Sequence, residues 1–455
     1  MKIINPATEE TLADVIEDTQ ESIEGKLYTL RQGQKQWAKK SVKERLDCIV
    51  RFGELILEKK EELAKILTSE TGKPIQQSLN EINGANKRIE HLKANAEKWL
   101  VEETVVAEGD TIEKISYEPL GVIANISAWN FPYNVGYNVF LYALVAGNAV
   151  LYKPSELATL TGKEFERYLI KAGVPGNVFQ TVIGGGEVGQ HLLDADLNGY
   201  FFTGSHATGL HIIKSVAHKM VPVQLELGGK DPLYVMDDVA DIKQAAINAA
   251  EGAFYNNGQS CCAVERIYVH ENIHDEFVGE LVKEVESYKM GNPMDEETFI
   301  GSLTRPQQIA VLDNQIMDAI DKGAEQKCGG NAPRGIGYFY APTVLVNADH
   351  NMKLMKDESF GPVIGIQKVS SDEEAIELMK DTEYGLTAAV FSSDEARAQK
   401  VFDEMDTGTV YWNCCDRVSP NVPWSGRKNS GLGSTLSFQG IRAFTQPKAY
   451  HLRRG

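Results

Sequence analysis

Residues 122–152 read VIANISAWNFPYNVGYNVFLYALVAGNAVLY, and this stretch decides how the chain folds. Short runs rich in β-branched and apolar residues, 122–127 and 149–152, enclose a longer apolar segment that opens on Pro132. Proline suits the first position of a helix, so the order strand, helix, strand is predicted. That order is typical of a parallel sheet covered by helices.

The same alternation continues toward the C-terminus. Further β-rich runs lie at 178–183, 200–203, 221–225, 263–270, 340–346, 363–369, 388–392 and 409–413. They predict a doubly wound, Rossmann-like fold in the first half, with ligands at the carboxyl ends of its strands, and a second α/β domain in the second half. A cleft between two such domains is where a site would form.

The N-terminal part differs in its periodicity. Apolar residues recur three or four apart over residues 12–100, which predicts helices, with an interruption at GKP (72–74). Residues 101–116 alternate around Gly109-Asp110, which predicts a β-hairpin.

Charge and hydropathy exclude several classes of protein. The 455 residues are 42% hydrophobic and carry a formal net charge of −18, so neither nucleic acid nor a membrane surface is expected as a partner. The densest basic run, residues 35–45, is interpreted as a solvated helix face. The N-terminus (MKIINPATEE) has no long apolar segment, so a cytoplasmic protein is expected.

Six cysteines are too few and too irregularly spaced for a disulfide scaffold, and no C-x-x-C spacing suggests zinc, so no metal is expected. Two of them, Cys261 and Cys262, stand in FYNNGQSCCAV (254–264) beside a glycine. A thiol in such a loop can be approached by a substrate and becomes a nucleophile when its surroundings lower its pKa. The alternative is a small buried apolar residue.

Two other polar residues end predicted strands. Glu226 in LELGGK (225–230) would be a general base if burial raises its pKa, or else a capping or surface glutamate. Asn130 in AWNFPY (128–133) would donate its amide to a developing oxyanion, or else serve as a turn residue.

Two glycine-rich stretches are candidates for binding a phosphate at a helix N-terminus. GGGEVG (184–189) fits the G-x-G-x-x-G pattern, but the acid expected near 20 residues on is not clear. GSHATG (204–209) follows a predicted strand and adds a hydroxyl, so it is favoured.

Together these segments resemble the NAD(P)-dependent aldehyde dehydrogenase superfamily over essentially the whole chain. The motifs that carry the resemblance occur in the same order and spacing: NPATEE (5–10), ETGKP (70–74), AWNFP (128–132), KPSE (153–156), FTGS (202–205), LELGGK (225–230), GQSC (258–261) and ESFGP (358–362).

The resemblance implies roles for individual residues. Cys261 matches the nucleophile and Cys262 only its neighbour, Glu226 matches the general base, and Asn130 the oxyanion donor. The cofactor-binding residues would be Lys153 and Glu156 at the adenosine ribose, Gly204 and Ser205 at the pyrophosphate, Trp129 packed near the cofactor, and Glu358 and Phe360 at the nicotinamide half.

The reaction implied is oxidation of an aldehyde to the carboxylic acid through a thiohemiacetal and a thioester that water hydrolyses. Glu226 favours this reaction over the coenzyme-A-acylating alternative, whose members commonly lack that glutamate. A non-catalytic relative would be expected to lack one of the three catalytic residues. Glu156 would repel a 2′-phosphate, so NAD is expected to be preferred, with NADP possible as cofactor.

The resemblance also bears on the substrate. Asn138 stands where semialdehyde dehydrogenases tend to carry an arginine, which disfavours the semialdehyde alternative. Tyr133, Tyr137 and Trp424 are either residues of the substrate tunnel or core residues, and an uncharged aliphatic or aromatic aldehyde is expected.

The implied architecture is an α/β dinucleotide-binding domain (1–100 and 120–227) and a second α/β catalytic domain (228–430). A small β oligomerisation element, comprising the hairpin (101–119) and the C-terminal strand (436–455), would complete the chain. Strand pairing between subunits implies a homodimer or homotetramer.

Overall fold

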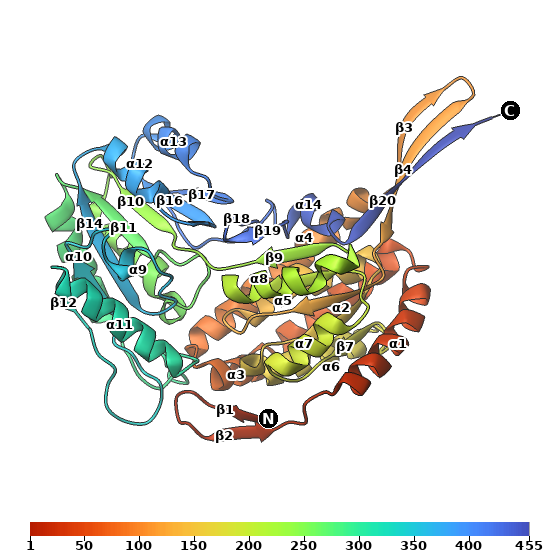
Figure 1. Ribbon diagram of the computed structural model, residues 1–455, viewed down its shortest axis with the longest axis horizontal. Helices are drawn as coiled ribbons and strands as arrows, with labels where there is room; N and C mark the ends of the chain where they lie inside the picture. Colours follow the sequence, from red (N-terminus) through yellow and green to blue (C-terminus); the bar gives the residue numbers. More distant parts are fainter. Residues whose placement is uncertain (455) are drawn as a thin grey trace.

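The computed structural model describes residues 1–454, which form two α/β units and a projecting β ribbon (Figure 1). The α/β fold class expected from the sequence is confirmed. In the first unit the strands lie in the order β7 (Phe179–Thr181), β6 (Ala149–Lys153), β5 (Val122–Ile126), β8 (Tyr200–Thr203) and β9 (Val223–Glu226). They are parallel, and β19 (Gly431–Leu432) pairs antiparallel with β9. The order reverses between β5 and β8, which is where ligands bind in such sheets.

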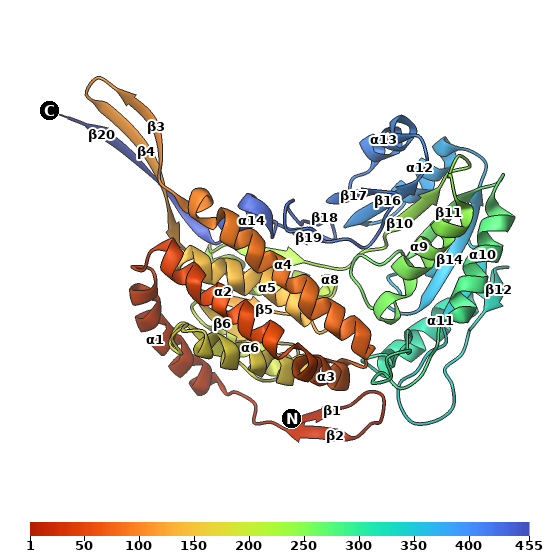
Figure 2. The same ribbon diagram turned by 180° about the vertical axis from the view of Figure 1, so that it is seen from behind.

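Helices cover this sheet, with α2 (Val42–Glu58) and α4 (Ile75–Leu100) packed on each other and on α5 (Pro132–Ala146) (Figure 2). The helical stretch predicted within residues 12–100 is confirmed from residue 20, whereas β2 (Thr11–Asp14) pairs with β1 (Lys2–Ile4). The helices of this unit are α1 (Gln20–Trp37), α2 (Val42–Glu58), α3 (Lys60–Thr71), α4 (Ile75–Leu100), α5 (Pro132–Ala146), η1 (Glu156–Ala158), α6 (Thr159–Lys171), α7 (Gly186–Asp194), α8 (His206–Val216) and η2 (Ala217–Lys219).

The basic run at 35–45 corrects one expectation. Its lysines are exposed, but Arg45 is buried and its Nε donates to the Val145 carbonyl at 2.9 Å. A guanidinium carries five donors, so it can satisfy backbone carbonyls where helices meet. The run is therefore a solvated face only in part.

The second unit contains another largely parallel sheet. Its strand order is β12 (Glu325–Cys328), β13 (Thr343–Val346), β14 (Val363–Val369), β11 (Arg266–His270), β10 (Pro232–Val235), β16 (Thr387–Phe391) and β17 (Thr409–Trp412), with β12 antiparallel. A small pair joins β15 (Tyr384–Gly385) and β18 (Arg427–Lys428). The helices are α9 (Ile242–Phe254), η3 (Tyr255–Gly258), α10 (His274–Ser287), α11 (Gln307–Asp321), η4 (Lys353–Met355), α12 (Asp372–Lys380) and α13 (Glu395–Glu404).

The predicted hairpin is confirmed and forms part of the ribbon. Strands β3 (Glu103–Glu108) and β4 (Thr111–Pro119) turn at Gly109, and β20 (Thr445–Arg453) pairs antiparallel with β4. The three strands project away from both units (Figures 1 and 2). Just before β20, α14 (Ser437–Arg442) packs against α4 and α5.

A short connection joins the two units. Strand β9 ends at Glu226 and β10 begins at Pro232, so the chain passes from the carboxyl end of the first sheet to the amino end of the second. Within residues 1–454 no helix is both long and apolar enough to cross a membrane.

Candidate active site

Asn130, Glu226 and Cys261 line one cavity of about 600 Å³. Asn130 follows β5, Glu226 ends β9, and Cys261 precedes β11. The carboxyl ends of the first sheet therefore face a loop at the amino end of the second. The structure brings the three candidate catalytic side chains to the same place from distant parts of the sequence.

An unusual backbone conformation shapes the loop that carries the thiol. Asn256, Asn257 and Gly258 have φ angles of 54°, 57° and 69°, in the left-handed region. At Gly258 a Cβ atom would stand 2.3 Å from the Gly361 carbonyl oxygen, so only glycine fits. The Asn256 amide donates to the carbonyls of Asn130 and Gln259, each at 3.1 Å. These contacts tie the loop to the segment that holds Asn130.

The two adjacent cysteines have different surroundings. Cys262 is buried, and its thiol donates to Asp416 Oδ1 at 2.8 Å. The hydrogen-bonding neighbour Cys261, burial and the Asp416 carboxylate raise the pKa of Cys262 well above its usual range, so it stays a neutral thiol. Cys261 is half-buried and free, and it lines the cavity described above. The geometry favours Cys261 as the reactive thiol.

Asn130 is placed to stabilise negative charge beside the thiol. Its side chain is buried, and one amide N–H donates to the Gln259 carbonyl at 3.1 Å. An asparagine amide carries two N–H donors, so the second remains for an oxygen in the cavity.

The Glu226 carboxyl group lies in an apolar setting. Burial raises its pKa to about 8, against the lowering effect of hydrogen bonds from Gln224 and Thr435. Oε1 accepts from Thr435 at 3.3 Å, whereas Oε2 is buried and has no partner among residues 1–454. A carboxyl group with such a pKa can take up a proton from water near neutral pH.

The two glycine-rich stretches line the same cavity instead of being alternatives. Gly185, Gly186 and Gly189 lie at the start of α7, and Gly204 and Ser205 at the start of α8. Helix N-termini present free N–H groups to an anion. A Cβ atom on Gly185 or Gly186 would meet nothing within 4 Å, so the main chain there is open.

Lys153, the last residue of β6, and Glu156, just past that strand, also line this cavity. Lys153 is buried, which lowers the pKa of its ammonium group. Glu156 is exposed and accepts a hydrogen bond from Ser155 at 3.2 Å. Beside the negatively charged Glu156, a ligand group that carries hydroxyls fits better than one that carries a negative charge.

Trp129, Glu358 and Phe360 line the cavity beside Cys261, and the Trp129 and Phe360 rings meet edge to face at 5.6 Å. Burial, with the charge of Glu265, raises the pKa of Glu358 to about 7. Phe360 has a φ of 46°, a conformation that L residues rarely adopt.

Glu265 is a buried carboxylate that the sequence argument missed, and it holds this strained segment. It accepts the N–H groups of Ser359 at 2.8 Å and Phe360 at 2.9 Å, and it pairs with Lys230 at 2.6 Å. Two charge-assisted hydrogen bonds to successive N–H groups fix a turn strongly. The signal available was Lys230 in LELGGK, a lysine in an apolar segment that requires a partner.

A second cavity, of about 570 Å³, lies on the other side of the thiol. Asn130 and Cys261 line both cavities, so the two meet there. Asn138 and Trp424 line the second cavity, in the place expected for a substrate tunnel.

Tyr133 and Tyr137 lie elsewhere, and the expectation that they belong to the tunnel is corrected. They are 0% and 1% exposed. Their rings pack edge to face in an aromatic cluster, Tyr133 on Phe165 at 4.8 Å and Tyr137 on Phe140 at 5.4 Å. Helix α5 is buried on nearly every side, so an aromatic residue near Asn130 need not face the cavity.

Arg88 is the residue of this second cavity that the sequence argument missed. It comes from α4, is 4% exposed, and its Nε donates to Asn138 Oδ1 at 2.5 Å. The absence of an arginine at position 138 therefore does not leave the tunnel without one. The residues expected in the tunnel were all uncharged, whereas the structure adds this guanidinium to the lining.

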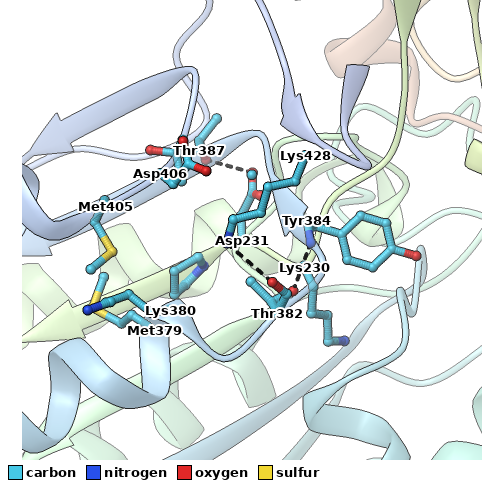
Figure 3. A pocket seen from close by; sticks show the side chains of 13 residues that line it. Lys230, Asp231, Met379, Lys380, Thr382, Tyr384, Thr387, Met405, Asp406 and Lys428 are labelled. Carbon is cyan, nitrogen blue, oxygen red and sulfur yellow. Dashed lines mark hydrogen bonds between the residues drawn. The ribbon is translucent and has the colours of Figure 1, made fainter. Parts of the chain in front are cut away.

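A small hollow elsewhere contains none of the candidate residues (Figure 3). It lies around Asp231, whose carboxylate accepts from Thr387 at 2.6 Å. At about 10 Å³ it holds at most one water molecule, so it is no ligand site.

The chain is similar to known proteins over nearly its whole length. The model of the aldehyde dehydrogenase family matches residues 1–450. The chain is 35% identical over 457 residues to aminoaldehyde dehydrogenase 1, peroxisomal, of Pisum sativum, covering 98% of this chain and 91% of that protein.

Two solved structures are similarly close. One is an E. coli NADP dependent enzyme, with a TM-score of 0.96 and 30% identity, covering 100% of this chain and 94% of that one. The other is betaine aldehyde dehydrogenase from Staphylococcus aureus in complex with NAD+, with a TM-score of 0.95 and 31% identity, covering 100% of this chain and 92% of that one.

Proposed function

The chain belongs to the aldehyde dehydrogenase family and is an oxidoreductase that acts on aldehydes, and we propose that Cys261 is its nucleophile, that water releases the product as a carboxylic acid, and that NAD is the preferred cofactor. One observation carries the proposal. Cys261 and Asn130 stand where the two cavities meet, and Glu226 lines the cavity with open helix N-termini.

The cofactor-side residues fit a dinucleotide. The N-termini of α7 and α8 supply N–H groups for the pyrophosphate, with Gly204 and Ser205 at the second of them. Lys153 and Glu156 would hold the adenosine ribose. Relatives of similar structure are described with NAD+ and as NADP dependent. Glu156 supports NAD, because its charge attracts a ribose hydroxyl as an acceptor and repels a 2′-phosphate.

The first half-reaction forms a bond between the Cys261 sulfur and the aldehyde carbon. The carbonyl oxygen becomes an oxyanion, and the free amide N–H of Asn130 stabilises it. A nicotinamide cofactor held by the cofactor-side residues would supply the acceptor for the hydride that leaves this carbon. The C=O bond then re-forms, which leaves a thioester on Cys261.

The second half-reaction is hydrolysis. Glu226 takes a proton from water, whose oxygen attacks the thioester carbon, and the C–S bond breaks to free the Cys261 thiolate and the carboxylic acid. The balance is aldehyde plus oxidised cofactor plus water, giving acid, reduced cofactor and a proton. The raised pKa of Glu226 supports this role, since it brings the carboxyl group's affinity for a proton close to neutral pH.

Coenzyme-A acylation is the second candidate for the fate of the thioester. The buried Glu226 favours water as the acceptor. If reduction of the cofactor required added coenzyme A, hydrolysis would be rejected.

The same proposal assigns a role to each part of the chain. Residues 1–100 and 120–227 would bind the cofactor, and 228–430 would supply the nucleophile. The ribbon formed by 101–119 and 436–455 would join subunits into a homodimer or homotetramer, since its two outer strands, β3 and β20, each pair on one side only within residues 1–454.

Replacement of the two cysteines tests the proposal. Cys261→Ala should reduce aldehyde-dependent NADH formation to the uncatalysed background, because no other thiol lines both cavities. Cys262→Ala is the matched control and should keep most of the activity, since this thiol is neutral and bonded to Asp416. Equal losses in both variants would reject Cys261 as the nucleophile.

A further inference from the structure

Arg88 is a buried cation that lacks an anionic partner. It is 4% exposed and lines the cavity beyond Cys261. Among residues 1–454 its side chain makes one hydrogen bond, from Nε to Asn138 Oδ1 at 2.5 Å, and no ion pair. A buried charge without a partner is costly, so it is normally paired.

The nearest carboxylate on the same helix face is already used. Glu81 lies seven residues before Arg88 on α4, and it forms a buried ion pair with Lys73. Its other oxygen accepts the Tyr133 N–H at 2.9 Å. Glu81 therefore lines the cavity and stabilises the Arg88 charge only at a distance, without forming an ion pair with it.

The free donors of Arg88 face the cavity. Neither terminal nitrogen has a hydrogen-bond partner among residues 1–454, and neither is closed off from solvent. Burial lowers the pKa of Arg88 to about 10, so the guanidinium stays charged at neutral pH. The paired N–H groups of a guanidinium match the two oxygens of a carboxylate.

Asn138 completes the donor set. An arginine has only donors, so the oxygen of the Asn138 amide must face Arg88 and its NH2 group must turn elsewhere. That NH2 group has no partner among the described residues, and Asn138 lines the same cavity. Arg88 and Asn138 together present N–H donors and no free acceptor.

The cavity also contains charged residues of both signs, and most of the acidic ones already have partners. Lys87 and Arg417 line it and are exposed. On the acidic side, Asp416 already accepts from Cys262 and Ser260, which leaves Glu251. The cavity thus holds three basic side chains against three acidic ones, two of which, Glu81 and Asp416, already accept hydrogen bonds.

We infer that Arg88 and Asn138 form a binding site for a carboxylate at the far end of the substrate, so that the preferred aldehydes are ω-carboxy aldehydes. The inference rests on the proposed function, in which the aldehyde group lies at Cys261. Asn138 lies seven residues beyond the N-cap Phe131 of α5, about 10 Å along the helix axis from the end that follows Asn130, which leaves room for a short carbon chain between the two groups. An ω-ammonium group would meet the guanidinium with like charge.

The test compares kcat/KM for three aldehydes of equal chain length, which end in a carboxylate, a methyl group or an ammonium group, at four to six carbons. The wild-type protein should prefer the carboxylate over the methyl group at least tenfold, and the ammonium group least. In Arg88→Gln the carboxylate-to-methyl ratio should fall at least tenfold, chiefly through KM. Lys93→Gln is the matched control, because it removes the same charge from an exposed part of α4, and its ratio should stay within twofold.

Other results would overturn the inference. A wild-type ratio near one, a preference for the ammonium group, or an unchanged ratio in Arg88→Gln would each do so. If Arg88→Gln fails to fold, inhibition of the wild-type protein decides: a saturated dicarboxylate should inhibit at least tenfold more strongly than the monocarboxylate of equal length, and equal inhibition would overturn the inference. Failure to oxidise any of the aldehydes would instead reject the proposed function.

Discussion

The two cavities that meet at Cys261 are of similar size and are built differently. The cofactor-side cavity is lined by residues at strand ends and helix starts, several of them glycines, and by side chains from recognisable motifs. The substrate-side cavity is lined mostly by side chains from helices α4 and α5 and from the 413–424 loop.

This difference separates what the fold supplies from what individual residues supply. Helix N-termini at the switch point of a parallel sheet bind phosphate whatever side chains follow. The preference for one aldehyde over another depends on a few side chains that meet across the fold, such as Arg88 and Asn138. A substitution in the cofactor-side cavity should therefore leave the preference among aldehydes unchanged, and a substitution in the substrate-side cavity should leave the preference between NAD and NADP unchanged.

The largest effect is expected at the boundary between the cavities. Asn130→Ala should lower kcat about 10²- to 10³-fold, the usual loss when one oxyanion donor is removed. Cofactor binding, measured by protein fluorescence, is the control and should be retained. A loss confined to KM would mean that Asn130 only positions the loop through its bond to Gln259.

The next effect concerns pH on the cofactor side. The base form of Glu226 is depleted below its pKa of about 8 and dominates above it. If hydrolysis limits turnover, the steady-state rate should rise about tenfold per pH unit up to about 8 and then level off. Stopped-flow measurement should find a rapid burst of NADH before the slow phase.

Glu226→Gln should flatten this pH profile and slow the steady state while the burst persists. A burst that slows in parallel with the steady state would place Glu226 before hydride transfer, contrary to the proposed role.

The smallest expected effect, on cofactor preference, separates the roles of the two cavities most clearly. Glu156→Gln should reduce the preference for NAD over NADP about fivefold, as expected for one exposed charge. Its preference among aldehydes should match the wild type, whereas Arg88→Gln should change aldehyde preference and keep cofactor preference. In the double variant, the changes in cofactor preference and in aldehyde preference should equal those of the two single variants. If either preference depended on the other substitution, the two cavities would not be independent.

Much of the fold could be predicted from the sequence because the parallel strands are continuous apolar runs. The strands at 200–203 and 363–369 have the predicted bounds. Strand β12 (EQKC) was missed because it is an exposed edge strand without an apolar pattern, and β10 (PLYV) because it is short and opens on proline.

The cofactor side could be predicted for a similar reason, since its residues stand next to glycines at strand ends. The substrate side could not. Arg88 lies in a polar helical stretch and meets Asn138 across fifty residues of chain, which no local pattern indicates. Tyr133 and Tyr137 adjoin Asn130 in sequence, but their direction depends on how α5 packs.

The central claim, that Cys261 carries the substrate as a thioester, can be tested directly by mass spectrometry. Glu226→Gln is mixed with NAD and an aldehyde, quenched in acid during the slow phase, and digested for tandem sequencing of the peptide that contains Cys261 and Cys262. The account predicts one acyl group per subunit on Cys261. An acyl group on Cys262, or none in a protein that has formed a stoichiometric burst of NADH, would contradict it.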